Sequence, residues 1–94
     1  MKTAKKSPMR KRWESLKKEN PGCLILMGFS DGWYEAFAED AERMHEVLSI
    51  PLTVMTSSES VAMTGFPKSD LDRHLSKLVE NRIRVAVVEP DPNV

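Results

Sequence analysis

The residues best suited to chemistry lie together between Phe29 and Glu35, in the run Phe-Ser-Asp-Gly-Trp-Tyr-Glu. Ser30-Asp31-Gly32 is a turn signal, so the two adjacent aromatics and the carboxylate after it would open a strand. Alternate strand residues point to opposite faces, and Trp33 and Glu35 would be displayed together if Tyr34 faced the core. An exposed aromatic can stack on a nucleic-acid base, which is worth about 1–3 kcal/mol in single strands. The alternative is a buried Trp33, since most tryptophans are largely buried.

A net charge of zero, from 14 basic and 14 acidic residues, hides an asymmetry along the chain. Residues 1–18 carry eight lysines or arginines against one acid, whereas the other 76 residues carry six basic and 13 acidic side chains. A basic arm can follow a phosphate backbone, because each neutralised phosphate releases counterions. A disordered, solubilising tail would account for the same charges. The side chains predicted to contact phosphate are Lys5, Lys6, Arg10, Lys11 and Arg12.

Catalytic and cofactor-binding patterns are missing from the sequence. It has no Gly-x-x-x-x-Gly-Lys-Ser/Thr phosphate loop and no dinucleotide-binding glycine pattern. His45 and His74 have no partner at a metal-ligand spacing, and there is no Cys/His cluster. A solvated helix face best explains the acids Glu39, Asp40, Glu42 and Glu46. We therefore expect no enzymatic activity, no cofactor and no metal site.

Cysteine usage and hydropathy indicate the compartment. One cysteine, Cys23, cannot form an internal disulfide, which fits a reducing cytoplasm. The longest apolar run, Cys23 to Phe29, is much shorter than the roughly 20 residues that cross a bilayer. The basic N-terminus has no apolar stretch behind it, unlike a secretory signal. We expect a cytoplasmic protein that has no membrane partner.

Hydrophobic spacing predicts the elements that must position these residues. Three helices are predicted: one from Ser7-Pro8 to just before Asn20, one with the apolar stripe Phe37, Ala41, Met44 and Leu48, and one with the stripe Leu71, Leu75, Leu78 and Val79. Strands are predicted at residues 23–27, 33–35, 52–55, 61–66 and 84–89. The expected fold is α/β, a small mixed β-sheet covered by about three helices. It would form one domain over residues 7–90, between a disordered basic arm at 1–6 and a tail at 91–94.

Several short motifs, in their order, resemble the N-terminal mismatch-recognition domain (domain I) of the MutS DNA mismatch repair family. Ser7-Pro8-Met9 is similar to that family's opening Thr-Pro-Met, and Trp33 to Ala41 to its Phe-Tyr-Glu-Leu-Phe followed by two acids and Ala. Leu48 to Thr53 resembles its Leu-Asp-Ile-Ser-Leu-Thr, and Met63 to Pro67 its Met-Ala-Gly-Ile-Pro. With two further motifs near the C-terminus, the resemblance extends to about Glu89.

The resemblance implies a binding role for the displayed pair. In this family the Phe of Phe-x-Glu stacks on a mispaired base from the minor groove, and the Glu two residues later hydrogen-bonds the same base. These roles fall on Trp33 and Glu35, and an indole is able to stack in place of a phenyl ring. The implied partners are double-stranded DNA, mismatched or distorted, and other mismatch repair proteins. The family's ATP binding belongs to regions outside this sequence.

Departures from the family pattern favour a second hypothesis. The basic residues usual after Leu-Thr are replaced by Val54 to Ser57, and the His after Gly-Ile-Pro by Lys68-Ser69. Fewer basic loop residues mean weaker contact with a DNA backbone. The leading hypothesis is a non-enzymatic DNA-binding module, and the alternative is a protein-interaction domain that kept the fold and lost the DNA role. A nuclease-like enzyme is the weakest, because no metal-ligand cluster is visible.

Overall fold

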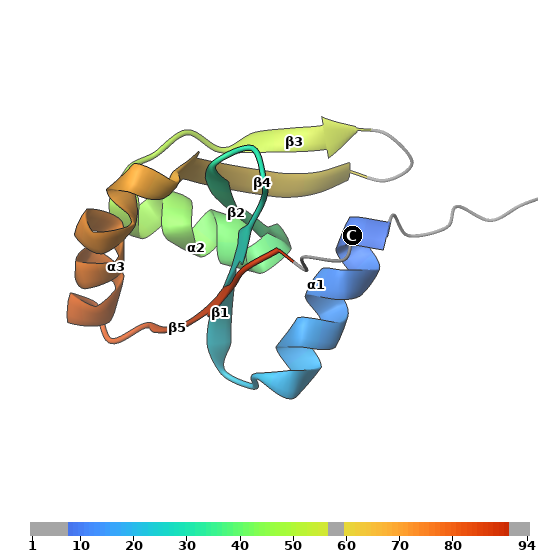
Figure 1. Ribbon diagram of the computed structural model, residues 1–94, viewed down its shortest axis with the longest axis horizontal. Helices are drawn as coiled ribbons and strands as arrows, with labels where there is room; N and C mark the ends of the chain where they lie inside the picture. The colour runs from blue at the N-terminus through green and yellow to red at the C-terminus, as the bar shows by residue number, and fades with distance from the viewer. Residues whose placement is uncertain (1–7, 57–59, 91–94) are drawn as a thin grey trace, which may run out of the picture.

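The computed structural model describes residues 8–56 and 60–90. Its elements follow in the order α1 (Pro8–Glu19), β1 (Cys23–Gly28), β2 (Trp33–Phe37), α2 (Ala38–Leu48), β3 (Thr53–Thr56), β4 (Ser60–Pro67), the 3-10 helix η1 (Lys68–Asp70), α3 (Leu71–Glu80) and β5 (Arg84–Val88). Figure 1 shows α1 and α3 on opposite sides of β1 and β5. The arm predicted at residues 1–6 and the tail at 91–94 lie outside the described residues.

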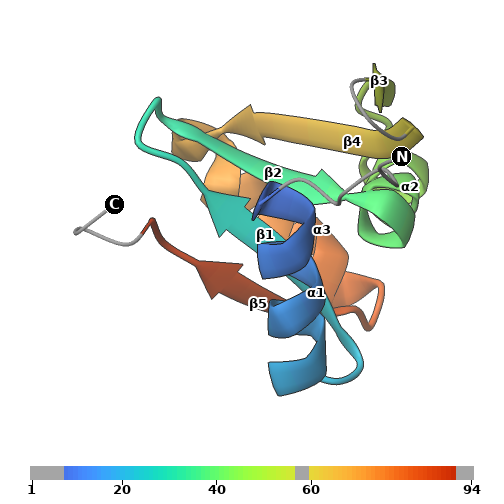
Figure 2. The ribbon, with the colours of Figure 1, turned by 90° about the vertical axis from the view of Figure 1, so that its right-hand side faces the viewer.

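Five strands form one sheet in the order β3-β4-β2-β1-β5. β1 pairs antiparallel with β2 and parallel with β5, whereas β4 pairs antiparallel with both β2 and β3. The sheet is therefore mixed, and with three α-helices in the described residues it confirms the predicted α/β fold. β1, β4 and β5 all end where β2 begins, as Figure 2 shows. We call this region, formed by Phe29–Trp33, Pro67–Lys68 and Glu89, the turn end of the sheet.

Each face of the sheet carries its own hydrophobic cluster. The cluster under α2 and α3 contains Leu24, Leu26, Tyr34, Ala36, Ala41, Met44, Leu48, Phe66, Leu78 and Ile83. The cluster under α1 contains Trp13, Ile25, Met27, Phe37 and Val61. Because helices cover both faces, β1 is apolar along its whole length rather than at alternate positions.

The second helix begins one residue later than the sequence predicts. Phe37 was expected in the apolar stripe of this helix, but it ends β2, where it pairs with Met63 and is buried under α1. Ala38, with φ of 55°, turns the chain from β2 into α2. Ser49, with φ of 59°, ends the helix, and its N–H donates to the carbonyl of His45.

One position of the predicted stripe in α3 is also wrong. Leu78 is fully buried, whereas Val79 is 59% exposed. The helix instead turns His74 toward the sheet, and the His74 ring packs on Phe66 with ring centroids 4.5 Å apart. Burial, with the charge of Arg73, lowers the pKa of His74. Within the described part of the chain, no helix is long and apolar enough to span a membrane.

Candidate nucleic-acid interface

Trp33 lies at the turn end of the sheet, where it begins β2 and is 41% exposed. The N–H of Gly32 donates to the carbonyl of Phe29 at 3.2 Å, and the N–H of Phe29 donates to the carbonyl of Trp33 at 2.9 Å. Gly32 has a φ of 91°, a conformation that favours glycine. Asp31 Oδ1 accepts a hydrogen bond from the Trp33 N–H at 3.1 Å. A hydrogen-bonded turn thus holds the indole at the surface. The alternative prediction from the sequence, a buried Trp33, is wrong.

Glu35 lies on the same face of the sheet as Trp33. Two residues further along β2, Phe37 packs in the cluster under α1, whereas Tyr34 and Ala36 pack in the cluster under α2 and α3. Because side chains alternate along a strand, Trp33, Glu35 and Phe37 share the α1 face. The aromatic ring and the carboxyl are therefore presented together, on the face of the sheet that α1 covers.

The surroundings of Glu35 are crowded. It is half-buried between its strand partners, Met27 in β1 and Gly65 in β4. A Cβ at Gly65 would come within 2.6 Å of the Tyr34 carbonyl oxygen and 3.0 Å of Glu35 Cγ, so only glycine lets β4 approach this closely. Burial raises the pKa of Glu35, and the Asp31 carboxylate raises it further. Glu35 therefore holds a proton at a higher pH than usual, and when protonated it can donate a hydrogen bond.

On the opposite face, Tyr34, Lys68 and Glu89 join three strands at the turn end. The Tyr34 hydroxyl donates to Glu89 Oε2, and Lys68 Nζ donates to Glu89 Oε1 at 3.3 Å. The same Nζ lies 5.2 Å from the centre of the Tyr34 ring, and the Lys68 N–H donates to the Gly32 carbonyl at 2.8 Å. A Cβ at Gly28 would lie 2.9 Å from the Tyr34 ring and 3.0 Å from Glu89 Oε1, so glycine leaves room for this contact.

The hydrogen bond between Tyr34 and Glu89 shifts the pKa values of both groups. It raises the pKa of Tyr34, because a hydroxyl that donates to a carboxylate resists losing its proton; burial and the charge of Glu89 act in the same direction. It lowers the pKa of Glu89, and the ammonium of Lys68 adds to this effect against the opposing effect of burial. Glu89 is therefore a stable anion beside the turn that carries Trp33.

The basic residues predicted to contact phosphate are described only in part. Lys11 and Arg12 are exposed on α1, the helix that covers the face shared by Trp33 and Glu35. Arg10 belongs to the first turn of the same helix. Lys5 and Lys6 lie outside the described residues. The structure thus places two exposed cations, Lys11 and Arg12, on the helix that packs over the sheet face shared by Trp33 and Glu35.

Asp40 is buried, although it was predicted to lie on a solvated helix face. Its Oδ2 accepts hydrogen bonds of 3.0 Å from both Trp13 Nε1 and the Ile25 N–H. Its Oδ1 lies 3.0 Å from Lys17 Nζ, which also donates to the carbonyl of Cys23 at 2.6 Å. Through these contacts, Lys17 links α1 to the start of β1 and to the first turn of α2.

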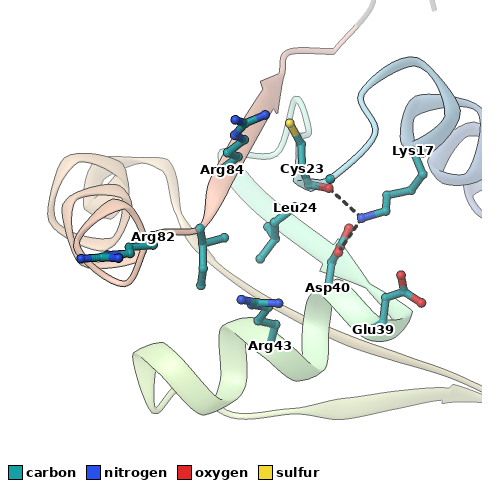
Figure 3. A pocket seen from close by; sticks show the side chains of 10 residues that line it. Lys17, Cys23, Leu24, Glu39, Asp40, Arg43, Arg82 and Arg84 are labelled. Atoms are coloured by element: carbon teal, nitrogen blue, oxygen red, sulfur yellow. Dashed lines mark hydrogen bonds and ion pairs between the residues drawn. The ribbon is translucent and has the colours of Figure 1, made fainter.

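A hollow of about 510 Å³ opens beside this network, at the end of β1 away from Trp33 (Figure 3). Its charged lining residues are Lys17, Glu39, Asp40, Arg43, Arg82 and Arg84. In Figure 3 the Arg43 guanidinium points toward the start of β5, whereas those of Arg82 and Arg84 point away from each other. Charges of both signs therefore line the hollow, and Lys17 and Asp40 among them form an ion pair. Among residues 8–56 and 60–90, no group of three His, Cys, Asp or Glu side chains is placed to hold a metal ion.

Lys68 and Glu89 were not predicted as site residues. Lys68 follows the Pro67 that ends β4, and Glu89 comes before Pro90, just after β5 ends. The sequence offered one signal for these two residues, because each is a charged residue next to a proline at the end of a strand. The contact itself joins residues far apart in the chain, and it depends on the parallel pairing of β1 and β5.

Comparison with known proteins shows which family the chain resembles in sequence. The family model described as MutS domain I matches residues 7–93. The DNA mismatch repair protein MutS of Salinibacter ruber is 34% identical over 86 residues, which cover 89% of this chain and 9% of that protein. The proteins of the same name from Thermosipho melanesiensis and Flavobacterium johnsoniae are 39% identical over 85 residues and 36% identical over 90 residues. These alignments cover 90% and 94% of this chain, and 10% of each relative.

The chain thus spans about a tenth of the length of the curated relatives it matches. The order of motifs that first indicated the family agrees with the match to the family model, which extends over nearly the whole chain. This protein belongs to the MutS domain I family.

Proposed function

We propose that this domain binds double-stranded DNA and contacts a mismatched or distorted site with Trp33 and Glu35. The observation that carries the proposal is the exposed indole at the turn end of the sheet, on the same face as the Glu35 carboxyl. Membership of the family supports it, since the relatives are named DNA mismatch repair proteins. In this proposal the domain acts by binding and not by catalysis.

The indole supplies a preference for weakened base steps. Stacking on a base is worth about 1–3 kcal/mol, whereas opening a duplex step costs a few kcal/mol. The opening cost is smallest at a mispaired base, so Trp33 binds a mismatch more tightly than a matched step. Glu35 adds a hydrogen bond to the same base, as an acceptor when ionised and as a donor when protonated.

The basic face of α1 supplies the attraction to phosphate. Lys11 and Arg12 are exposed there, and we assign Arg10 and the arm residues Lys5 and Lys6 to the same contact. Each neutralised phosphate steepens the dependence of log affinity on log salt by about 0.9. The binding should therefore be weak at high salt and should rise steeply as salt is removed.

A protein-interaction domain is the second candidate, and the outer surface of α2 favours it. This helix exposes three glutamates, Glu39, Glu42 and Glu46, which would repel a DNA backbone and suit a basic protein surface. The natural partners in that case are other mismatch repair proteins. In either role we place the protein in the cytoplasm, where the free thiol of Cys23 stays reduced.

Titration with matched and mismatched duplexes of equal length, at two salt concentrations, tests the proposal through tryptophan fluorescence. Wild type should bind the mismatched duplex more tightly, and Trp33→Ala should lose this preference while keeping salt-dependent binding. Trp13 is buried and hydrogen-bonded to Asp40, so the Trp33→Ala variant gives its background emission. Equal affinity of the wild type for the two duplexes, or an unchanged preference in Trp33→Ala, would count against the proposal.

A further inference from the structure

We propose that Lys68 is a phosphate contact of the DNA-binding edge and that Glu89 and Tyr34 position it. The inference rests on the proposed function, because it assigns a further residue to the same edge. Lys68 stands outside the basic N-terminal segment, in the short helix η1 between β4 and α3. The charge pattern of the sequence, which concentrates basic residues at the N-terminus, therefore did not predict Lys68 as a site residue.

Lys68 lies beside the turn that presents Trp33. Its N–H donates to the Gly32 carbonyl at 2.8 Å, and the residue before it, Pro67, pairs with Trp33. The minor groove is only about 6 Å wide, so a side chain that enters it has a phosphate backbone close on either side. A lysine next to the strand partner of Trp33 is therefore within reach of a phosphate that flanks the contacted base.

Lys68 and helix α1 lie on opposite faces of the sheet. Trp33 and Glu35 share the α1 face, whereas the Lys68 ammonium lies over the ring of Tyr34, which packs on the other face. With Trp33 in the groove, Lys11 and Arg12 would face one backbone and Lys68 the other. In this arrangement both DNA strands are contacted by cations, one on each side of the base step that Trp33 contacts.

The ammonium of Lys68 has donors left for a phosphate. It carries three N–H groups, of which one contacts Glu89 at a long 3.3 Å, and the side chain is 30% exposed. The Glu89 carboxylate is itself 57% exposed, so solvent screens the pair and makes it weak. A phosphate oxygen can thus join or replace Glu89 as the acceptor.

Glu89 and Tyr34 hold the lysine at the turn end before DNA arrives. Tyr34 donates to one oxygen of Glu89 while Lys68 donates to the other, and Gly28 leaves the space for both. The same carboxylate opposes an incoming phosphate by its charge. It also competes with a phosphate oxygen for the Lys68 ammonium. Replacing Glu89 by a neutral glutamine should therefore tighten duplex binding, and the gain should be smaller when Lys68 is absent.

The test compares the salt dependence of duplex affinity for the whole chain and its Lys68→Gln variant. The slope of log affinity against log salt should fall by about 0.9, so from 50 to 200 mM salt wild-type affinity drops roughly 3.5-fold more than that of the variant. Lys68→Met, which keeps the aliphatic stem over Tyr34, should behave like Lys68→Gln. Lys68→Arg should keep the wild-type slope, as should Lys77→Gln, which removes an exposed lysine of α3.

An unchanged slope in both neutral Lys68 variants overturns the inference. If the wild type binds duplex and Trp33→Ala loses the mismatch preference while this slope is unchanged, only the role of Lys68 fails. If the wild type binds no duplex, the proposed function fails as well. Two Glu89 variants separate its two effects. Glu89→Gln keeps an acceptor for Lys68 but loses the charge that competes with phosphate, so it should tighten binding in the wild type and have a smaller effect beside Lys68→Gln. Glu89→Ala removes the acceptor as well, so it should bind less tightly than Glu89→Gln; equal affinity of these two variants overturns the positioning role.

Discussion

The indole Nε1 of Trp13 donates a hydrogen bond of 3.0 Å to Oδ2 of Asp40, and this bond fastens α1 to the first turn of α2. The same carboxylate accepts the Ile25 N–H and pairs with Lys17. One buried acid thus fixes the basic helix on the face of the sheet that carries Trp33. The position of the candidate phosphate-binding residues depends on this contact.

Replacing Asp40 by Asn should destabilise the domain. The amide keeps one acceptor oxygen, but its NH₂ group meets a donor, and Lys17 loses its anionic partner. We expect a loss of about 1–3 kcal/mol in the free energy of unfolding, measured by urea denaturation with circular dichroism. Glu39→Gln is the matched control, because this neighbouring acid is exposed and should change stability by less than about 0.5 kcal/mol. Equal midpoints for the two variants would rule out the role of Asp40.

The sequence predicted the order of the elements and the hairpin correctly, since these depend on local patterns. The turn at Ser30-Asp31-Gly32 and the alternation of Trp33, Tyr34 and Glu35 follow from backbone geometry alone. Phe37 was assigned to the second helix instead of β2 because an apolar residue at an element boundary fits either period. Such a residue is assigned by the tertiary packing around it.

The polar contacts of the site could not be predicted in the same way. Asp40 stands four residues before the buried Met44, so its spacing fits the apolar stripe of α2. A carboxylate is costly to bury without partners, and its partners lie 15 to 27 positions away in the chain. The contact of Lys68 with Glu89 likewise appears only once β4 and β5 end at the same edge. Knowing the strand order would have been necessary to predict either contact.

Glu35 should reduce stability at neutral pH. Its pKa is raised in the folded domain by burial and by Asp31, so the stability it contributes is present below its ordinary pKa and is lost as the pH rises through the raised value. Glu35→Gln should therefore melt higher than the wild type at neutral pH, and the difference should vanish near about pH 3. Thermal denaturation across this pH range measures the effect.

Glu89→Gln should have the opposite effect on stability at neutral pH from Glu35→Gln. The pKa of Glu89 is lowered by the hydrogen bond from Tyr34, so its contribution is present above its ordinary pKa and is lost as the pH falls. The variant should melt lower than the wild type at neutral pH, with the difference again vanishing in acid. A stability gain in both variants would show that the two carboxyls do not differ in the way described.

Gly65→Ala should loosen the pairing of β2 with β4. The new Cβ would lie 2.6 Å from the Tyr34 carbonyl oxygen, and a backbone atom cannot move aside as a flexible side chain can. Overpacking of this kind costs about 1–3 kcal/mol, and hydrogen exchange in β2 and β4 should become faster. Because Glu35 Cγ is also crowded, the variant should lose affinity for a mismatched duplex.

Gly22→Ala serves as the control for Gly65→Ala. A Cβ at Gly22 meets nothing within 4 Å, and the only penalty is its φ of 81°, worth about 1–2 kcal/mol. This variant should be destabilised without faster exchange in β2 and β4 relative to the rest of the sheet. Similar exchange patterns in both variants would argue that the close approach at Gly65 is unimportant.

Removing the charges of α1 should weaken binding to every duplex equally. The double variant Lys11→Gln with Arg12→Gln removes two exposed cations from α1, the helix that covers the face shared by Trp33 and Glu35. The slope of log affinity against log salt should fall by about 1.8, that is, about 0.9 for each phosphate that is no longer neutralised. The ratio of affinities for mismatched and matched duplexes should stay at the wild-type value, because phosphate contacts carry no base information. Fluorescence anisotropy of a labelled duplex over a range of salt concentrations gives both quantities, with Lys77→Gln as the control. A changed ratio would mean that α1 takes part in reading the base, and an unchanged slope would mean that the helix does not face DNA.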